Sequence, residues 1–160
     1  MSTLRPYRGL LAVVVVTISL AALPLGLARS RPSTDPWTAS QTIQPADLAK
    51  ELSAGKSAPT VLFVGHPRLY AAGHIKGAQF HGMGSSMEGL AEIKTWADPL
   101  PRITNLVIYC GCCPMEKCPN LRPAFALLQQ MDFKHLRVLI LASSFAIDWA
   151  DKGLPYDKGQ

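Results

Sequence analysis

Residues 105–128 read NLVIYCGCCPMEKCPNLRPAFALL, and this stretch holds all four cysteines of the 160-residue chain. Residues 105–109 have the length and composition of a buried strand, and Cys110 follows them directly. Asn120 is placed to cap a helix. The residues expected on the inner face of that helix are Leu121, Phe125 and Leu128. The stretch therefore predicts a strand, a cysteine-rich loop and a helix in succession.

The rest of the chain repeats this alternation of strands and helices. Residues 60–64 and 137–141 are further apolar runs of strand length. A continuous apolar run indicates burial on both faces, as in a parallel sheet covered by helices. The helical segments are expected at residues 45–52, 87–96 and 145–152. We therefore predict an α/β domain with an open, mainly parallel sheet of about five strands and helices on both faces.

The N-terminus, residues 1–28, has the charge order of an export segment. Arg5 and Arg8 precede an apolar run that reaches residue 28. The run is long enough to cross a bilayer, so we expect either a cleaved signal or a membrane anchor. The domain is accordingly expected outside the cytoplasm, periplasmic or membrane-anchored, and in contact with the membrane only through this segment.

Two features bound the remainder of the chain. Residues 29–42 are rich in Ser, Thr and Pro and are expected to form a linker, which leaves residues 43–160 as the folded domain. The formal net charge is +5, and no cluster of Lys and Arg is interleaved with aromatic residues. Nucleic acid is therefore not an expected partner.

The position of Cys110 predicts a nucleophilic thiol. In open parallel sheets, ligands bind at the carboxyl ends of the strands, and Cys110 follows such an end. Loop N–H groups and the N-terminus of the next helix are expected to converge on its sulfur and to favour the thiolate. Four cysteines within nine positions cannot crosslink distant parts of a fold, so no structural disulfide framework is expected.

Three stretches of the chain, taken in order, resemble one family. YAAGHIKGA at residues 70–78 is similar to the motif E-Y-x-x-G-H-I-P-G-A, and VIYC at 107–110 is similar to a strand that delivers a catalytic cysteine. WADKGLP at 149–155 is similar to a closing W-x-x-x-G-x-P. Over residues 43–159 the chain thus resembles the rhodanese-like domains, a family of sulfurtransferases and persulfide carriers.

The chain departs from the family pattern in the charged residues and in the loop. The family's D-V-R aligns with residues 63–65, FVG, and its Glu before the Tyr aligns with Leu69, so a charged network is missing. The family's loop is C-x-x-G-x-[RS]. Here residues 110–120 form a longer loop that carries three additional cysteines.

The resemblance implies a sulfurtransferase or persulfide carrier in which Cys110 takes up sulfane sulfur. The expected partners are a small anionic sulfur donor, such as thiosulfate or a persulfide, and a thiol acceptor, without a cofactor. The substrate-binding residues are expected to be Gly111, Cys112 and Cys113, through their loop amides, and Lys117 and Arg122, through their charges.

The four cysteines also leave two other classes open. A thiolate metal-binding module would use Cys110, Cys112, Cys113 and Cys118 as ligands for Zn, Cu or an iron–sulfur cluster. A thiol–disulfide redox protein would use the C-x-x-C spacing of Cys110 and Cys113. In a sulfurtransferase, the additional thiols could resolve a persulfide as a disulfide.

Overall fold

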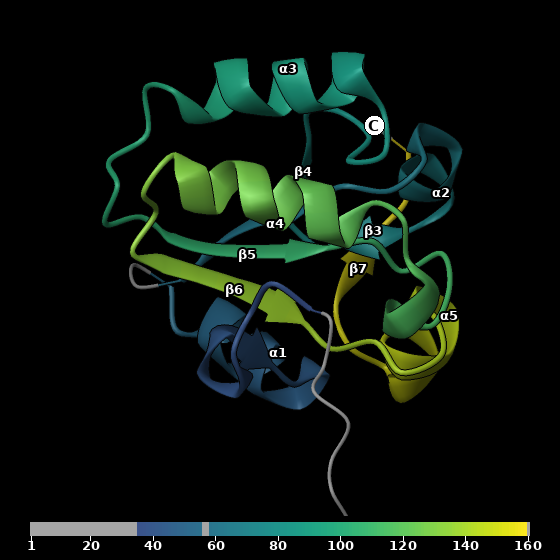
Figure 1. Cartoon of the computed structure of the whole chain (residues 1–160). Helices are drawn as coiled ribbons and strands as arrows, with labels where there is room; N and C mark the ends of the chain where they lie inside the picture. The colour runs from purple at the N-terminus through teal and green to yellow at the C-terminus, as the bar shows by residue number, and fades with distance from the viewer. Residues whose placement is uncertain (1–34, 56–57, 160) are drawn as a thin grey trace, which may run out of the picture. The chain divides into compact units, whose positions relative to one another are not determined.

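A five-stranded sheet forms the centre of the domain in the computed structural model, which describes residues 35–55 and 58–159. Its strand order is β1-β6-β5-β2-β4, and every pairing in it is parallel (Figure 1). The strands are β1 (Thr42–Ile43), β2 (Thr60–Phe63), β4 (Gln79–Phe80), β5 (Asn105–Tyr109) and β6 (His135–Leu139). The predicted fold class is confirmed.

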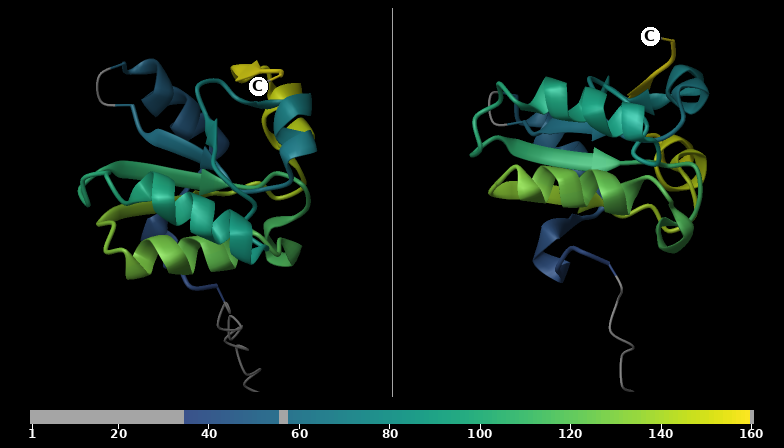
Figure 2. Two further views of the ribbon diagram at one scale, coloured as in Figure 1. Left: turned by 90° about the horizontal axis from the view of Figure 1, so that it is seen from above. Right: turned by 45° about the horizontal axis from the view of Figure 1, so that its top comes forward.

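Helices cover both faces of this sheet. Helices α3 (Met87–Ala97) and α4 (Leu121–Gln130) lie side by side on one face, as the two views of Figure 2 show. Helix α1 (Pro45–Ser53) covers the other face (Figure 1). The short helix α5 (Phe145–Asp148) and the 3-10 turn η3 (Ala150–Lys152) follow β6.

A second, small sheet closes the carboxyl end of the domain. Strand β3 (His74–Ile75) follows helix α2 (Pro67–Ala72) and pairs antiparallel with β7 (Tyr156–Asp157) near the end of the chain. The Gly159 N–H donates to the carbonyl of Ala71 at 2.8 Å. Gly159 thereby lies beside α2, at the edge where the parallel strands end.

The central strand β5 explains why the parallel sheet forms. Leu106 and Ile108 pack in the apolar cluster under α3 and α4, whereas Val107 and Tyr109 pack in the cluster on the opposite face. All four side chains are fully buried. Alternate side chains of one strand thus fill two separate cores, which is why the whole run is apolar.

Some predicted boundaries differ from the structure. The strand expected at 137–141 is β6, which begins and ends two residues earlier. The helix expected at 145–152 is interrupted at Trp149, whose φ of −126° is not helical. Two 3-10 turns, η1 (Ala39–Gln41) and η2 (Met115–Lys117), complete the elements of the described residues.

The folded domain begins before the expected boundary at residue 43. Trp37 is only 7% exposed, and its ring forms a T-shaped contact with Phe125 on α4, with 5.3 Å between the ring centroids. Asp35 forms an ion pair with Arg122 at 2.5 Å. The expected linker therefore overlaps the domain, because an isolated tryptophan fills a core position that apolar periodicity does not reveal.

The expected export segment, residues 1–28, lies outside the described residues. Among residues 35–55 and 58–159, no helix is long and apolar enough to span a membrane.

Candidate functional site

Cys110 lies at the carboxyl end of the central strand. It directly follows β5, between the ends of β2 and β6, and only 2% of it is exposed. Gly65 lies beside it after β2. A Cβ atom at Gly65 would lie 3.0 Å from the Cys110 sulfur and 2.5 Å from the Phe63 ring, so only glycine allows this close approach. The sulfur is thus held at the position expected for a ligand-binding residue.

The loop after Cys110 is fixed by the segment that follows β6. Gly111 has a φ of +76°, which favours glycine, and a Cβ there would lie 2.8 Å from the Cβ of Phe145. The carbonyl of Gly111 accepts a hydrogen bond from the Phe145 N–H at 3.0 Å. Farther along the loop, the Met115 N–H donates to the Leu141 carbonyl at 3.4 Å.

The loop brings three of the four cysteine sulfurs into one group. The sulfurs of Cys110, Cys112 and Cys118 all lie within 4.8 Å of one another. The Cys110 and Cys112 sulfurs are 3.1 Å apart, and those of Cys112 and Cys113 are 3.2 Å apart. Cys110 and Cys118 are buried, whereas Cys112 is exposed and Cys113 is half-buried. All four are free thiols, and buried and accessible sulfurs are in contact.

Asn120 binds the Cys110 sulfur instead of capping helix α4. Its side chain makes no capping hydrogen bond. Its Nδ2 donates to the Cys110 sulfur at 3.3 Å, and its Oδ1 accepts from the Ser85 N–H at 3.0 Å. Only 5% of Asn120 is exposed, and its hydrogen bond to the Cys110 sulfur is buried. The sequence placed Asn120 correctly at the start of α4 but gave no sign of this contact.

The amide groups at the N-terminus of α4 face Cys118, not Cys110 as the sequence predicted. A hydrogen bond from Cys110 is the largest cause that lowers the pKa of the Cys118 thiol to about 6. The N–H groups of Asn120 and Leu121 lower it further, against the effect of burial. The same shared hydrogen bond raises the pKa of Cys110, and burial adds to this shift. Both shifts favour the proton on Cys110 and the negative charge on Cys118.

The two outer cysteines have a different electrostatic environment. Burial, followed by the thiol of Cys112, raises the pKa of Cys113 to about 12. Cys113 is therefore a neutral thiol at physiological pH. The N–H of Cys112 donates a hydrogen bond to the Cys110 sulfur and opposes the rise of its pKa. Of the three loop amides expected to serve Cys110, that of Cys112 lies at the sulfur.

A cavity of about 380 Å³ opens over Cys110. Cys110, Gly111 and Cys112 line one side of it. The apolar residues on its wall include Phe63, Leu69, Phe145 and Tyr156, and the polar ones are Ser144 and Lys158. Cys118 does not line the cavity. A small donor could therefore reach Cys110 and Cys112 from this side.

The two cations expected at the site do not line this cavity. Lys117 is exposed on η2. Arg122 binds Asp35 and the Cys118 carbonyl, and it lies over the Trp37 ring at 5.8 Å. The cation that does line the cavity is Lys158, in the exposed segment after β7. Sequence reasoning missed Lys158 because it reaches the site only through the pairing of β3 with β7.

The sulfurs of Cys110, Cys112 and Cys118 could also hold a soft metal ion. Thiolate bonds to zinc are about 2.3 Å long, so ligand sulfurs lie about 3.8 Å apart. The separations here begin at 3.1 Å and stay within 4.8 Å, so small side-chain movements would suffice. Soft thiolates favour Cu(I) or zinc. The fourth expected ligand, Cys113, is not part of this group.

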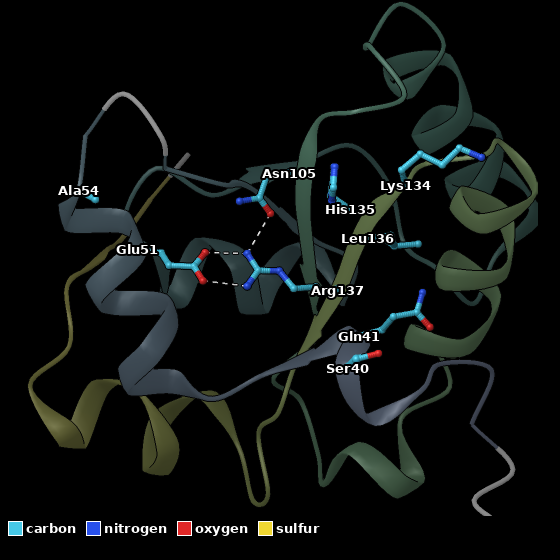
Figure 3. Close-up of a pocket in the computed structure, with 9 residues that line it drawn as sticks. All are labelled: Ser40, Gln41, Glu51, Ala54, Asn105, Lys134, His135, Leu136 and Arg137. Carbon is cyan, nitrogen blue, oxygen red and sulfur yellow. Dashed lines mark hydrogen bonds and ion pairs between the residues drawn. The ribbon is translucent and has the colours of Figure 1, made fainter.

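A larger hollow of about 700 Å³ lies at the opposite, amino end of the strands (Figure 3). Its central feature is Arg137, which binds both carboxylate oxygens of Glu51 at 2.8 and 2.6 Å and the Asn105 Oδ1 at 2.9 Å. The charged and polar groups of these three residues are already paired with one another, and the cysteines do not line this hollow. The cavity at Cys110 is therefore the better candidate despite its smaller volume.

No family model and no curated relative matches this chain. The fold is similar to those of several solved structures, among them the following three. The rhodanese-like domain of the Alr3790 protein from Anabaena is 23% identical, with a TM-score of 0.54, over 74% of this chain and 79% of that chain. The BH2092 protein from Bacillus halodurans is 20% identical, with a TM-score of 0.58, over 74% of this chain and 77% of that chain. A full-length protein from Lactobacillus plantarum is 18% identical, with a TM-score of 0.55, over 74% of this chain and 88% of that chain.

These likenesses establish the architecture. The chain has the rhodanese-like fold, as the sequence motifs predicted.

Proposed function

We propose that the chain is a sulfurtransferase or persulfide carrier in which Cys110 accepts sulfane sulfur from a small anionic donor. One observation carries the proposal: Cys110 lines a cavity of about 380 Å³, and the Asn120 Nδ2 and the Cys112 N–H donate hydrogen bonds to its sulfur. A nucleophile beside a base, with donors aimed at the developing charge, suits covalent catalysis.

The resting proton arrangement supplies a base for the first step. As Cys110 attacks the outer sulfur of thiosulfate, its proton passes to the thiolate of Cys118. Sulfite leaves, and Cys110 becomes an anionic persulfide whose charge is stabilised by Asn120 and the Cys112 amide. Lys158 at the cavity wall attracts the anionic donor. A thiol acceptor would then take the outer sulfur.

The test is sulfite release from thiosulfate by the reduced protein with excess thiol. We expect turnover by the native chain and none by Cys110→Ser. Cys113→Ser is the matched comparison, because it removes a loop thiol outside the three-sulfur group and keeps the backbone amide. Absence of sulfite release from thiosulfate, together with no transfer of sulfur to Cys110 from a small-molecule persulfide, would contradict the proposal.

A second candidate is a binding site for one soft metal ion at Cys110, Cys112 and Cys118, favoured by the grouping of their sulfurs within 4.8 Å. Metal content measured after anaerobic purification tests it. About one Cu or Zn per chain, lost equally with Ser at each of the three positions, would support a metal-binding module. A chain that retains no metal after incubation with either ion would contradict it.

We also propose that the domain works outside the cytoplasm, because an apolar run follows Arg5 and Arg8 at the N-terminus. Fusion of residues 1–42 to a reporter that is active only after export tests this proposal. A reporter that stays inactive would contradict it.

A further inference from the structure

Cys118 is a buried neighbour of Cys110 that does not line the cavity. Its sulfur lies within 4.8 Å of the Cys110 sulfur, and only 1% of Cys118 is exposed. Cys110 and Cys112 line the cavity, and Cys118 does not. The Cys110 sulfur is therefore reached by a donor from the cavity side and by Cys118 from the protein side.

This arrangement has a consequence for a persulfide on Cys110. We expect the outer sulfur to extend toward the cavity, because Gly65 is buried beside the Cys110 sulfur and Cys110 shares an apolar cluster with Leu121 and Ala124 of α4. Displacement at a divalent sulfur proceeds in line, so the attacking sulfur enters opposite the leaving one. Because Cys118 is within 4.8 Å of Cys110 and does not line the cavity, it is the neighbouring thiol available to the inner sulfur.

Cys112 is placed differently, although its sulfur is 3.1 Å from that of Cys110. It is exposed and lines the cavity, so it stands on the side of the outer sulfur. Attack from that side would move the outer sulfur to Cys112 without releasing sulfide. The two neighbouring thiols of Cys110 thus differ in the sulfur atom that each can reach.

We propose that Cys118 is a built-in resolving thiol that releases the sulfane sulfur as hydrosulfide, a step that rests on the proposed uptake of sulfur by Cys110. In this step the Cys118 thiol attacks the inner sulfur of the anionic Cys110 persulfide. A Cys110–Cys118 disulfide forms, the bond between the inner and outer sulfurs breaks, and the Cys118 proton leaves with the outer sulfur as HS⁻.

The balance of the cycle defines the partner that it needs. One thiosulfate, the Cys110 thiol and the Cys118 thiolate give one sulfite, one hydrosulfide and one disulfide. The disulfide must then be reduced by an external dithiol through thiol–disulfide exchange. The physiological partner is accordingly a dithiol reductant. The two sulfurs must close from within 4.8 Å to about 2.05 Å, a movement that the loop between them has to provide.

The test is a single turnover of the full chain, reduced, freed of reductant and kept anaerobic, with one equivalent of thiosulfate. The probes are sulfite, trapped sulfide and the intact mass of the protein after rapid alkylation. We expect the native chain to release sulfite and sulfide and to lose two hydrogens. Cys118→Ser lacks the base of the first step and should release sulfite more slowly, but each sulfite released should leave one extra sulfur on Cys110. Sulfide should then follow sulfite on the order of tenfold more slowly than in the native chain, or worse.

A chain with Cys112→Ser and Cys113→Ser together keeps only Cys110 and Cys118. It should still release sulfide and form the disulfide, which has then only one possible pairing. Cys118→Ala repeats the Cys118→Ser experiment without a hydroxyl group near the helix amides.

The outcomes separate the resolving role from sulfur uptake. Sulfide release by both Cys118 variants at the native rate, or a stable persulfide on the native chain, overturns the role of Cys118 while leaving the uptake by Cys110 intact. If the variant with both Cys112→Ser and Cys113→Ser releases no sulfide, the resolving role of Cys118 is likewise overturned, and Cys112 becomes the resolving thiol. If neither the native chain nor any variant releases sulfite, the proposed uptake of sulfur by Cys110 fails, and the resolving role of Cys118 fails with it.

Discussion

The side-chain amide of Asn120 donates from Nδ2 to the Cys110 sulfur at 3.3 Å, and its orientation is set on the other side by the Ser85 backbone. Because Oδ1 accepts the Ser85 N–H, the NH₂ group is the end that faces the sulfur. The contact links the loop before α3 to the end of β5. A negative charge that develops on Cys110 thus meets a donor that is already in place.

We expect Asn120→Asp to slow persulfide formation by about ten- to a hundredfold, because it replaces a donor beside the sulfur with a negative oxygen. The substitution has nearly the same shape and keeps an acceptor for the Ser85 N–H. Sulfite release from thiosulfate measures the effect. Ser85→Ala is the matched control, since it keeps the backbone amide that holds Asn120. Equal rates for Asn120→Asp and the native chain would show that this hydrogen bond does not assist the reaction.

Lys158 should contribute to donor binding more than Lys117 does. Lys158 lines the cavity at Cys110, whereas Lys117 does not. Removing an exposed charge beside a binding site has a modest effect, so Lys158→Ala should raise the KM for thiosulfate by about threefold and leave kcat nearly unchanged. Added salt should reduce the difference. A larger rise in KM for Lys117→Ala than for Lys158→Ala would support the expectation from the sequence that Lys117 binds the donor.

The charge on Cys118 should be visible in a pH titration. Its pKa is lowered to about 6 by the hydrogen bond from Cys110 and by the N–H groups of Asn120 and Leu121. Because the pKa lies below the usual thiol range, the thiolate is present above about pH 6 and is lost as the pH falls through that value. The ultraviolet absorbance of the thiolate in the reduced, metal-free protein should show this transition.

Cys118→Ser should remove the transition near pH 6. Cys113→Ser should retain it, since the Cys113 thiol has its pKa raised to about 12. A transition that persists in Cys118→Ser would assign the low pKa to another sulfur.

The elements at the centre of the sheet could be predicted because their signal is local. Residues 105–109 were expected as a strand and form β5 with those bounds, since a continuous apolar run has few other places in an α/β fold. The burial of Phe125 and Trp149 agrees with the helical face and closing motif that contained them. The position of Cys110 at a strand end followed from the same strand.

The parts of the site that could not be predicted depend on the path of the chain far from the loop. Lys158 reaches the cavity because β3 pairs with β7, although more than half of the domain's sequence separates these two strands. Strands of two residues are too short to show a periodic pattern. Cys118 is buried whereas Cys112 is exposed, because η2 turns the loop back toward α4. The number and spacing of the cysteines in the sequence could not show which of them is buried and which is exposed.

Trp37 should make residues 35–42 part of the folding unit. Its ring is 7% exposed and packs edge-on against Phe125, and Trp→Ala at such a position costs about 3 kcal/mol or more of the free energy of unfolding. A chain that begins at Ser33 should therefore unfold at a clearly higher denaturant concentration than one that begins at Ile43. Trp37→Ala in the longer chain should reproduce most of that loss, whereas Thr38→Ala, at an exposed neighbour, should not. Equal midpoints for the two truncated chains would return residues 35–42 to the role of a linker.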